Sequence, residues 1–309
     1  MKTRNLISLM ALLIVVIGFS VTGCKKDKTD NSSVDPTSLQ QLANDENQVQ
    51  NASDEAMNDV NLLLSGSALK STENLPCNAT IDSTSIVNDT ITIHITYNGL
   101  NCNGTRYRTG QVEIKKRVGT HWFQAGATVT VKHINLTITK VSNQKTITLN
   151  GTKTHQNVSG GVIAQLGNGV TSIVYRTWGL ETVTFSDTTT RTWNVARQQT
   201  FTGTPSALVM ALDGFGNAGQ YGNLVVWGTN RKGENFFTQI TQSVVLRQVC
   251  EWDPCSGIKI HQIPSDSKSA TLTFGYDRHD QPITNGDCPA KYKVDWQKNN
   301  HSGTVYLWL

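Results

Sequence analysis

The chain of 309 residues lacks an apolar run long enough to cross a bilayer. Its longest apolar run, at residues 6–19, has roughly 14 residues, whereas a spanning helix needs about 20. Charged residues are also scarce, at 16% of the chain, and the formal net charge is only +4. Because lysine and arginine are scattered among acidic residues, no basic stripe indicates a nucleic-acid partner. The sequence therefore predicts neither a membrane-spanning helix nor nucleic-acid binding.

Motifs that carry enzyme chemistry are also missing or out of context. The seven histidines form no H-E-x-x-H or H-x-H pattern. Residues 214–219 match the dinucleotide-binding pattern G-x-G-x-x-G, but a strand-like segment, 224–227, follows where a helix must hold the pyrophosphate. Residues 265–268 match S-x-x-K, but they lie between predicted strands, where the lysine is not one helical turn from the serine. The sequence thus predicts no catalytic residue and no cofactor.

Metal-ligating residue types occur in two places without the spacing of a known site. Cys250 and Cys255 form a C-x4-C, but no second pair of ligands with zinc-like spacing lies nearby. One loop gathers three carboxylates and an imidazole, which are possible ligands of a calcium ion: Asp277, His279, Asp280 and Asp287. Acidic turn residues are the ordinary explanation of that loop, and we predict no metal site.

The apolar run instead belongs to an N-terminal export signal. Lys2 and Arg4 precede the run and small residues follow it, and such a segment is removed from the mature protein. The signal ends in Val-Thr-Gly-Cys at residues 21–24, which resembles the lipobox of bacterial lipoproteins. That resemblance implies removal of residues 1–23, acyl chains on Cys24 and anchoring in the outer membrane, because several acyl chains hold a protein firmly. The alternative is an ordinary cleaved signal with a chance cysteine.

Residues 24–75 are predicted to form a lipid-anchored tether and an amphipathic helix. The lysine-rich residues 25–30 resemble leaders that direct lipoproteins of the Bacteroidota to the cell surface, and a solvated linker is the alternative. Asp35 and Pro36 are typical of a helix start. Apolar residues then recur at helical spacing: Leu39, Leu42, Val49, Ala56, Val60, Leu63 and Leu64. This stripe, with acidic residues between its members, either packs on the β domain or docks a partner.

Residues 76–309 are predicted to form an antiparallel β domain, either a β-sandwich or a barrel-like sheet. In residues 90–97, TITIHITY, apolar and polar side chains alternate with the period of a strand. About ten such segments follow one another, separated by short Gly- and Asn-rich turns without interleaved helices. In residues 128–139 the alternation changes parity, which indicates a β-bulge near Lys132 and His133.

Six cysteines define the possible covalent links. With Cys24 acylated, five remain in an oxidising envelope, so at most two disulfides form and one thiol is left over. The two ends of the β domain share a layout in which one cysteine precedes a strand and another follows the next turn. This layout predicts the pairs Cys77–Cys102 and Cys250–Cys288. The shorter loop should add about 3 kcal/mol of stability.

A segment at residues 97–110, YNGLNCNGTRYRTG, precedes a predicted strand and resembles a recurring segment of uncharacterised lipoproteins of the Bacteroidota. Those proteins similarly begin with a lipobox and a polar helix, and they end with a cysteine after a Phe-Gly or Tyr-Gly strand. Phe274, Gly275 and Cys288 match that ending, although the interval at residues 276–286 is longer than in the family pattern. The resemblance implies a shared all-β fold and no particular activity.

The expected function is that of a non-catalytic envelope lipoprotein that binds a glycan or another envelope protein. Tryptophan side chains either stack on such a partner or fill the core: Trp122, Trp178, Trp193, Trp227, Trp252, Trp296 and Trp308. One alternative is an envelope hydrolase, since paired carboxylates meet in the fold and need no local motif. Another is an outer-membrane barrel, because residues 305–309 are rich in aromatics. The sequence leaves open whether the domain faces the periplasm or the cell surface.

Overall fold

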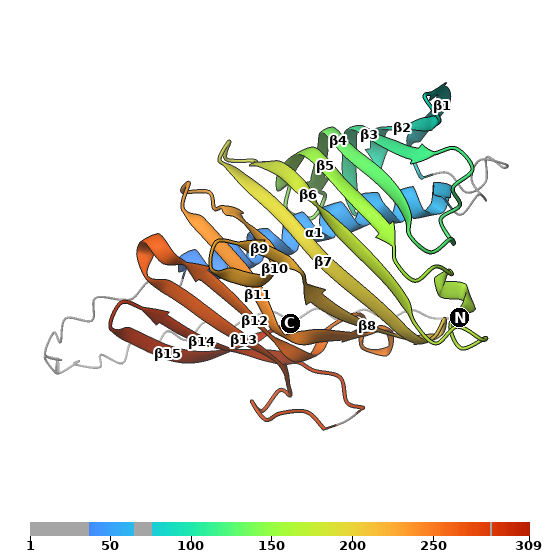
Figure 1. Ribbon diagram of the computed structural model, residues 1–309. Coiled ribbons are helices and arrows are strands. Elements are labelled where there is room, and N and C mark those ends of the chain that lie inside the picture. Colours follow the sequence, from blue (N-terminus) through green and yellow to red (C-terminus); the bar gives the residue numbers. More distant parts are fainter. Residues whose placement is uncertain (1–36, 65–75, 285) are drawn as a thin grey trace, which may run out of the picture. The chain divides into compact units, whose positions relative to one another are not determined.

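The computed structural model describes residues 37–64, 76–284 and 286–309. The predicted export signal, the predicted acylation site at Cys24, the tether and the predicted helix start at Asp35 and Pro36 lie outside the described residues. All described residues belong to one compact unit, Asp35–Leu309. This unit contains one long helix, α1 (Thr37–Leu64), and one large sheet (Figure 1).

The sheet has fifteen strands: β1 (Ala79–Val87), β2 (Thr90–Leu100), β3 (Arg106–Arg117), β4 (Ala127–Lys140), β5 (Thr146–Asn157), β6 (Ile173–Phe185), β7 (Thr190–Thr204), β8 (Ala207–Gly214), β9 (Gly216–Ala218), β10 (Tyr221–Thr229), β11 (Asn235–Arg247), β12 (Pro254–Ile263), β13 (Lys268–Tyr276), β14 (Lys291–Lys298) and β15 (His301–Trp308). Short 3-10 helices lie in the loops: η2 (Ile163–Gln165), η3 (Gln248–Cys250) and η4 (Pro264–Asp266).

Neighbouring strands pair antiparallel and mostly in chain order, because short turns join them. Strand β8 pairs with both β7 and β11, and β10 pairs with the same two strands. These four strands therefore close into a small barrel within the large sheet. The prediction of a mainly β, antiparallel domain is confirmed in its barrel-like form, and the described strands form a single sheet rather than the two facing sheets of a sandwich.

The alternating pattern of the sequence corresponds to the two faces of the strands. In β2, Ile93, Ile95 and Tyr97 are buried, as the alternation predicts. The pairing of β4 with β5 shifts register between His133 and Leu136. Asn135, between those two residues, has φ +47°, a left-handed conformation that asparagine tolerates better than most residues. The predicted β-bulge is thus present, about two residues beyond the position that the parity change indicates.

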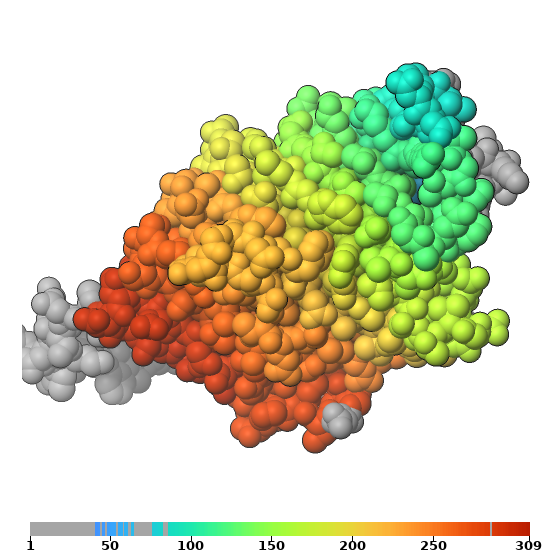
Figure 2. Space-filling model, viewed as in Figure 1, coloured from blue at the N-terminus to red at the C-terminus, as the bar shows by residue number. Residues whose placement is uncertain are grey.

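Helix α1 packs against one face of the sheet. Its apolar residues Leu42, Val49 and Val60 share a single hydrophobic core with apolar side chains of the strands, so the predicted stripe packs on the β domain. At β6 the face under the helix carries buried Glu181, whereas the opposite face carries Trp178, which is 36% exposed. We call these the helix-covered face and the open face. In Figure 2, viewed as in Figure 1, the strands hide nearly all of α1.

Carboxylates of α1 meet arginines of the sheet near both ends of the helix. Asp45 accepts two hydrogen bonds from Arg231, which follows β10, at 2.6 and 2.8 Å. Asp59 accepts a hydrogen bond from Arg108 of β3 at 2.7 Å and one from the Tyr97 hydroxyl at 2.8 Å. Asp45 and Asp59 therefore face the sheet, where charge-assisted hydrogen bonds satisfy them.

Several buried or half-buried arginines of the β domain lie over aromatic rings. Arg108 lies 4.4 Å from the centre of the Tyr97 ring, and Arg191 lies 4.5 Å from that of Phe236. Arg231 lies 3.5 Å from the centre of the Phe185 ring. Such cation–π contacts gain strength where water is excluded. The β domain therefore holds these cations from one side, and α1 supplies carboxylates to Arg108 and Arg231 from the other.

Both predicted disulfides are present in the structure, and they agree with the pairing that the repeated layout predicts. Cys77 pairs with Cys102, and Cys250 pairs with Cys288. Cys255, the remaining cysteine of the described residues, is buried and has a free thiol. Burial raises the pKa of this thiol, which keeps it protonated and unreactive.

Candidate functional site

Two cavities lie beside α1 on the helix-covered face, and together we call them the α1 groove. The first has a volume of about 450 Å³ and the second about 520 Å³. Both are lined by Gln50 and Asn51 of the helix and by Leu246 and Trp252 of the sheet side. The cavities therefore adjoin at these four residues. Their volumes fall in the range of pockets that bind small molecules.

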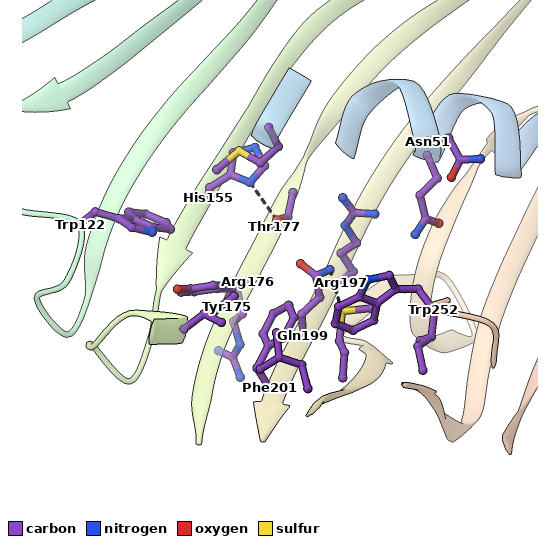
Figure 3. A pocket seen from close by; sticks show the side chains of 16 residues that line it. Asn51, Trp122, His155, Tyr175, Arg176, Thr177, Arg197, Gln199, Phe201 and Trp252 are labelled. Atoms are coloured by element: carbon purple, nitrogen blue, oxygen red, sulfur yellow. Dashed lines mark hydrogen bonds between the residues drawn. The ribbon is translucent and has the colours of Figure 1, made fainter. Parts of the chain in front are cut away.

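The first cavity has aromatic walls and a polar floor. Trp122 and Trp252 lie on opposite sides of it, with Gln199 between them (Figure 3). Tyr175 and Phe201, at the lower edge in that view, stack at a tilt with their ring centres 5.8 Å apart. A ligand in this cavity would meet aromatic faces at both ends and an amide in the middle.

A strained loop places Trp252 where the two cavities adjoin. Glu251 and Trp252 have φ of +55° and +68°, which is unusual for two consecutive residues other than glycine. The Trp252 amide donates to the carbonyl of Arg247 at 3.0 Å, and the neighbouring Cys250 is tied to Cys288 by the disulfide. Backbone strain of this kind persists only where the surroundings enforce it, and it is frequent at binding sites.

The floor of the first cavity includes a neutral histidine. The Thr177 hydroxyl and Nδ1 of His155 lie 2.9 Å apart, a contact drawn as a dashed line in Figure 3. Burial, together with the charges of Lys153 and Arg197, lowers the pKa of His155 well below its usual value. The ring is therefore uncharged at neutral pH and can exchange hydrogen bonds with a ligand without adding a charge.

Among the described residues, two side-chain carboxylates line the second cavity, and their pKa values are shifted in opposite directions. Burial raises the pKa of Glu46, but His261 and Lys259 outweigh burial, and the pKa is about 2. The Glu46 Oε1 atom accepts a hydrogen bond from the Thr238 hydroxyl at 2.6 Å. The pKa of Asp253 is raised by burial and by the charge of Glu251. Carboxylates whose environments separate their pKa values in this way occur as acid–base pairs in hydrolases.

A serine and a lysine also meet between α1 and the sheet. The Lys153 ammonium donates to the Ser53 hydroxyl at 2.5 Å and lies 2.7 Å from a carboxylate oxygen of Glu181. His133 hydrogen-bonds the other oxygen of that carboxylate. Serine–lysine pairs act as nucleophile and base in some enzymes, but these four side chains are buried and line neither cavity. This cluster therefore stabilises the packing of α1 on β5 and β6, and it does not contact either cavity.

The motifs dismissed on sequence grounds lie where their context indicated. The glycine-rich residues 214–219 join β8, β9 and β10, so strands flank them and no helix follows. In the S-x-x-K segment, Lys268 begins β13 and pairs with Asp266. In the acidic loop, Asp277 accepts backbone hydrogen bonds from His279 and Gln281.

The other carboxylates of that loop are also engaged by neighbouring residues. Asp280 pairs with Lys291 at 2.7 Å, and Asp287 accepts a hydrogen bond from Thr284. Across the described ranges, no cluster of three or more His, Cys, Asp or Glu side chains has a metal-binding arrangement. Of the helical segments that the structure describes, none is both long and apolar enough to cross a membrane.

Tryptophans occur both in the core and in the lining of the groove, and stacking on a partner stays a prediction. Trp193 is almost fully buried in the core, whereas Trp252 and Trp308 line the groove. Trp122 belongs to both, because it is a core residue with 9% exposure that also lines the first cavity. Trp252 remains 38% exposed, as a residue that contacts a ligand must. The groove residues Gln50 and Asn51 carry no sequence signal, because a polar residue on a helix is ordinarily solvated. No protein-family model, curated protein or solved structure matches the chain.

Proposed function

We propose that this protein is a lipoprotein of the bacterial outer membrane, anchored by acyl chains on Cys24, whose β domain binds a glycan in the α1 groove without transforming it. The N-terminal pattern of basic start, apolar run and lipobox supports the anchor. The groove supports the ligand class, through aromatic walls combined with amide side chains. The membrane, through the lipid, and a glycan are the proposed partners.

The observation that carries the proposal is the pair of tryptophans on opposite sides of a polar floor (Figure 3). A sugar ring has apolar C–H faces and a rim of hydroxyls. Its C–H groups suit the electron-rich faces of Trp122 and Trp252, and its hydroxyls suit the amides of Gln50, Asn51 and Gln199. A ligand that was apolar throughout would displace water from these amides without replacing its hydrogen bonds, which costs free energy.

The groove favours a glycan over the other expected partner, an envelope protein. Stable protein interfaces bury about 800 Å² on each partner, usually on a rather flat surface. The α1 groove instead consists of two adjoining cavities of 450 and 520 Å³. Cavities of this size enclose a few sugar rings, and their arrangement side by side suits a linear oligosaccharide.

A glycan array with the purified full chain tests the ligand, followed by calorimetry on the oligosaccharides that bind. Trp252→Ala should weaken binding by about tenfold or more, since a buried aromatic anchor is worth about 2 kcal/mol. Trp178→Ala is the matched control, because Trp178 on the open face is equally exposed, at 36% against 38%. If the wild-type protein binds no glycan, or if Trp252→Ala binds as the wild type does, the proposal is wrong.

The anchor and the orientation of the domain need a separate experiment. Cys24→Ala should abolish metabolic labelling with palmitate and release the protein from the membrane fraction. Protease treatment of intact cells, with lysed cells as the control, then distinguishes the two orientations. Digestion in intact cells places the domain at the cell surface, and protection until lysis places it in the periplasm.

The second cavity supports one alternative function, glycan hydrolysis. Asp253, with its raised pKa, would act as the general acid, and ionised Glu46 would stabilise positive charge on the sugar. Release of reducing ends from the glycans that bind, abolished by Asp253→Asn with binding intact, would establish this activity. Binding without any product leaves the non-catalytic function in place.

A further inference from the structure

Lys259 occupies an unusual position on the floor of the second cavity. It lies on β12, where its register partners are Ile240 on β11 and Leu272 on β13. Both partners are buried apolar residues. The lysine therefore projects from an apolar part of the helix-covered face, where a charged group is costly unless it is paired.

No pairing of Lys259 is present in the part of the chain that the structure describes. Its ammonium forms no hydrogen bond and no ion pair there, in contrast to Lys153, which pairs with Glu181 at 2.7 Å. Glu46 is near enough to attract Lys259. However, Glu46 already accepts a hydrogen bond from Thr238 at 2.6 Å and lies 3.6 Å from Nδ1 of His261.

The surroundings of Lys259 favour an added negative charge. Burial lowers the pKa of Lys259, and the positive charge of Arg197 lowers it further, while Glu46 acts in the opposite direction. Arg197 lines the adjoining first cavity. A second positive charge nearby means that an anion bound at Lys259 would also be attracted by Arg197. The other carboxylate of the second cavity, Asp253, forms no ion pair with Lys259 among the described residues.

We propose that Lys259 is an anion-binding site and that the glycan bound in the α1 groove is acidic, with a carboxylate or sulfate group placed on the Lys259 ammonium. The inference rests on the proposed glycan-binding function and specifies its ligand class. Trp252, Tyr292 and Trp308 also line this cavity, so a sugar ring can lie against an aromatic side chain while its acidic group meets the lysine. The anion supplies the partner that the described residues do not provide.

The anion site is tested first with inorganic sulfate as the probe. Thermal unfolding of the wild type, Lys259→Met and Lys132→Met is followed in sulfate and in chloride at equal ionic strength. Lys132 is exposed on the open face of β4, so its replacement removes the same charge at a distant place. Sulfate stabilises any folded protein by exclusion from its surface, and only a difference between variants reports binding.

We expect sulfate to raise the unfolding temperature of the wild type and of Lys132→Met more than that of Lys259→Met. An equal increase in all three proteins overturns the anion site. Lys259→Met keeps the length of the side chain, and its far-ultraviolet circular dichroism shows independently whether it folds.

The ligand class is tested on an array that contains matched pairs, namely uronic acid or sulfated oligosaccharides and their uncharged counterparts. The wild type should bind the acidic member of a pair, and Lys259→Met should lose about 10- to 100-fold in affinity, as for a hydrogen bond to a charged group. Lys132→Met should bind as the wild type does. Binding of uncharged glycans alone, or unchanged binding by Lys259→Met, overturns the inference.

The two experiments separate failure of this inference from failure of the proposed function. A sulfate effect that depends on Lys259, without any glycan bound on the array, means that the groove binds an anion other than a glycan. Glycan binding that depends on Trp252 but not on Lys259 means that the proposed function holds and the ligand is uncharged.

Discussion

Lys153 and Lys259 both lie on the helix-covered face of the sheet, but their surroundings differ. Lys153 on β5 pairs with Glu181 at 2.7 Å and lies 4.3 Å from the centre of the Trp193 ring. Lys259 on β12 lies between Ile240 and Leu272 and pairs with nothing in the described part of the chain. The first charge stabilises the contact between α1 and the sheet. The second costs free energy until a ligand pairs with it, which is the behaviour of a functional residue.

The largest expected effect is the loss of the paired lysine. Lys153→Met leaves the buried Glu181 carboxylate with His133 as its one remaining ion-pair partner among the described residues. Breaking a buried ion pair typically costs about 3–5 kcal/mol. Urea unfolding followed by tryptophan fluorescence measures the change. Lys132→Met on the open face should change the free energy of unfolding by less than about 0.5 kcal/mol. A cost below about 1 kcal/mol for Lys153→Met would mean that the pair does not hold the helix in place.

Acid should weaken the same contacts between helix and sheet. Burial raises the pKa of Glu181, but Lys153 and His133 outweigh it, so the pKa falls from 4.5 to about 2, as it does for Glu46. Because these pKa values are lower in the folded state, their stabilising effect is complete above pH 4.5 and is lost as the pH falls to about 2. Each carboxyl contributes on the order of 3 kcal/mol.

Urea midpoints between pH 2 and pH 6 measure this dependence. Glu181→Gln should be less stable than the wild type at pH 6, and its stability should fall less between pH 4.5 and pH 2. Identical slopes for the wild type and this variant would show that Glu181 is not ionised in the folded protein.

The unpaired lysine should respond to the same substitution with the opposite sign. Lys259→Met removes an ammonium that pairs with none of the described residues from between two apolar register partners, so in the absence of ligand we expect the protein to be stabilised by about 1–3 kcal/mol. The measurement is the urea midpoint at neutral pH and low salt. A destabilisation as large as that of Lys153→Met would mean that Lys259 stabilises the fold and has no need of a ligand.

The sequence predicts the strands better than it predicts what covers them. Alternation in β2 correctly places Ile93 and Ile95 in the core, because the period of two directly reports which face is buried. The same pattern does not indicate whether a second sheet or a helix covers that face. A sandwich and a single helix-covered sheet were therefore both compatible with it. The apolar spacing of α1 is informative in the same way, since Leu42, Val49 and Val60 all enter the core.

The candidate site could not be predicted from the sequence, because some of its polar residues face the helix, whereas polar residues of a strand usually face solvent. In β12, Ile258 and Ile260 alternate with Lys259 and His261, and the polar pair faces the helix. Hydrophobicity alone would predict that the isoleucines face the helix-covered core. Elsewhere on this face, charged residues are buried because partners far away in sequence satisfy them, as Arg231 does for Asp45. Such partners are visible only in the fold.

The smallest expected effect concerns an ion pair away from the helix. Asp89, in the turn between β1 and β2, lies 3.3 Å from Arg117, and both side chains are more than half exposed. Asp89→Asn removes the charge but keeps the side-chain shape, and asparagine tolerates the φ of +63° at this position. Because water and salt screen exposed pairs, the free energy of unfolding should change by less than about 0.5 kcal/mol. Urea unfolding at low and high salt measures it. A loss comparable to that of Lys153→Met would show that charge stabilises this fold wherever it occurs, whereas a negligible loss locates the stabilising charges between the helix and the sheet.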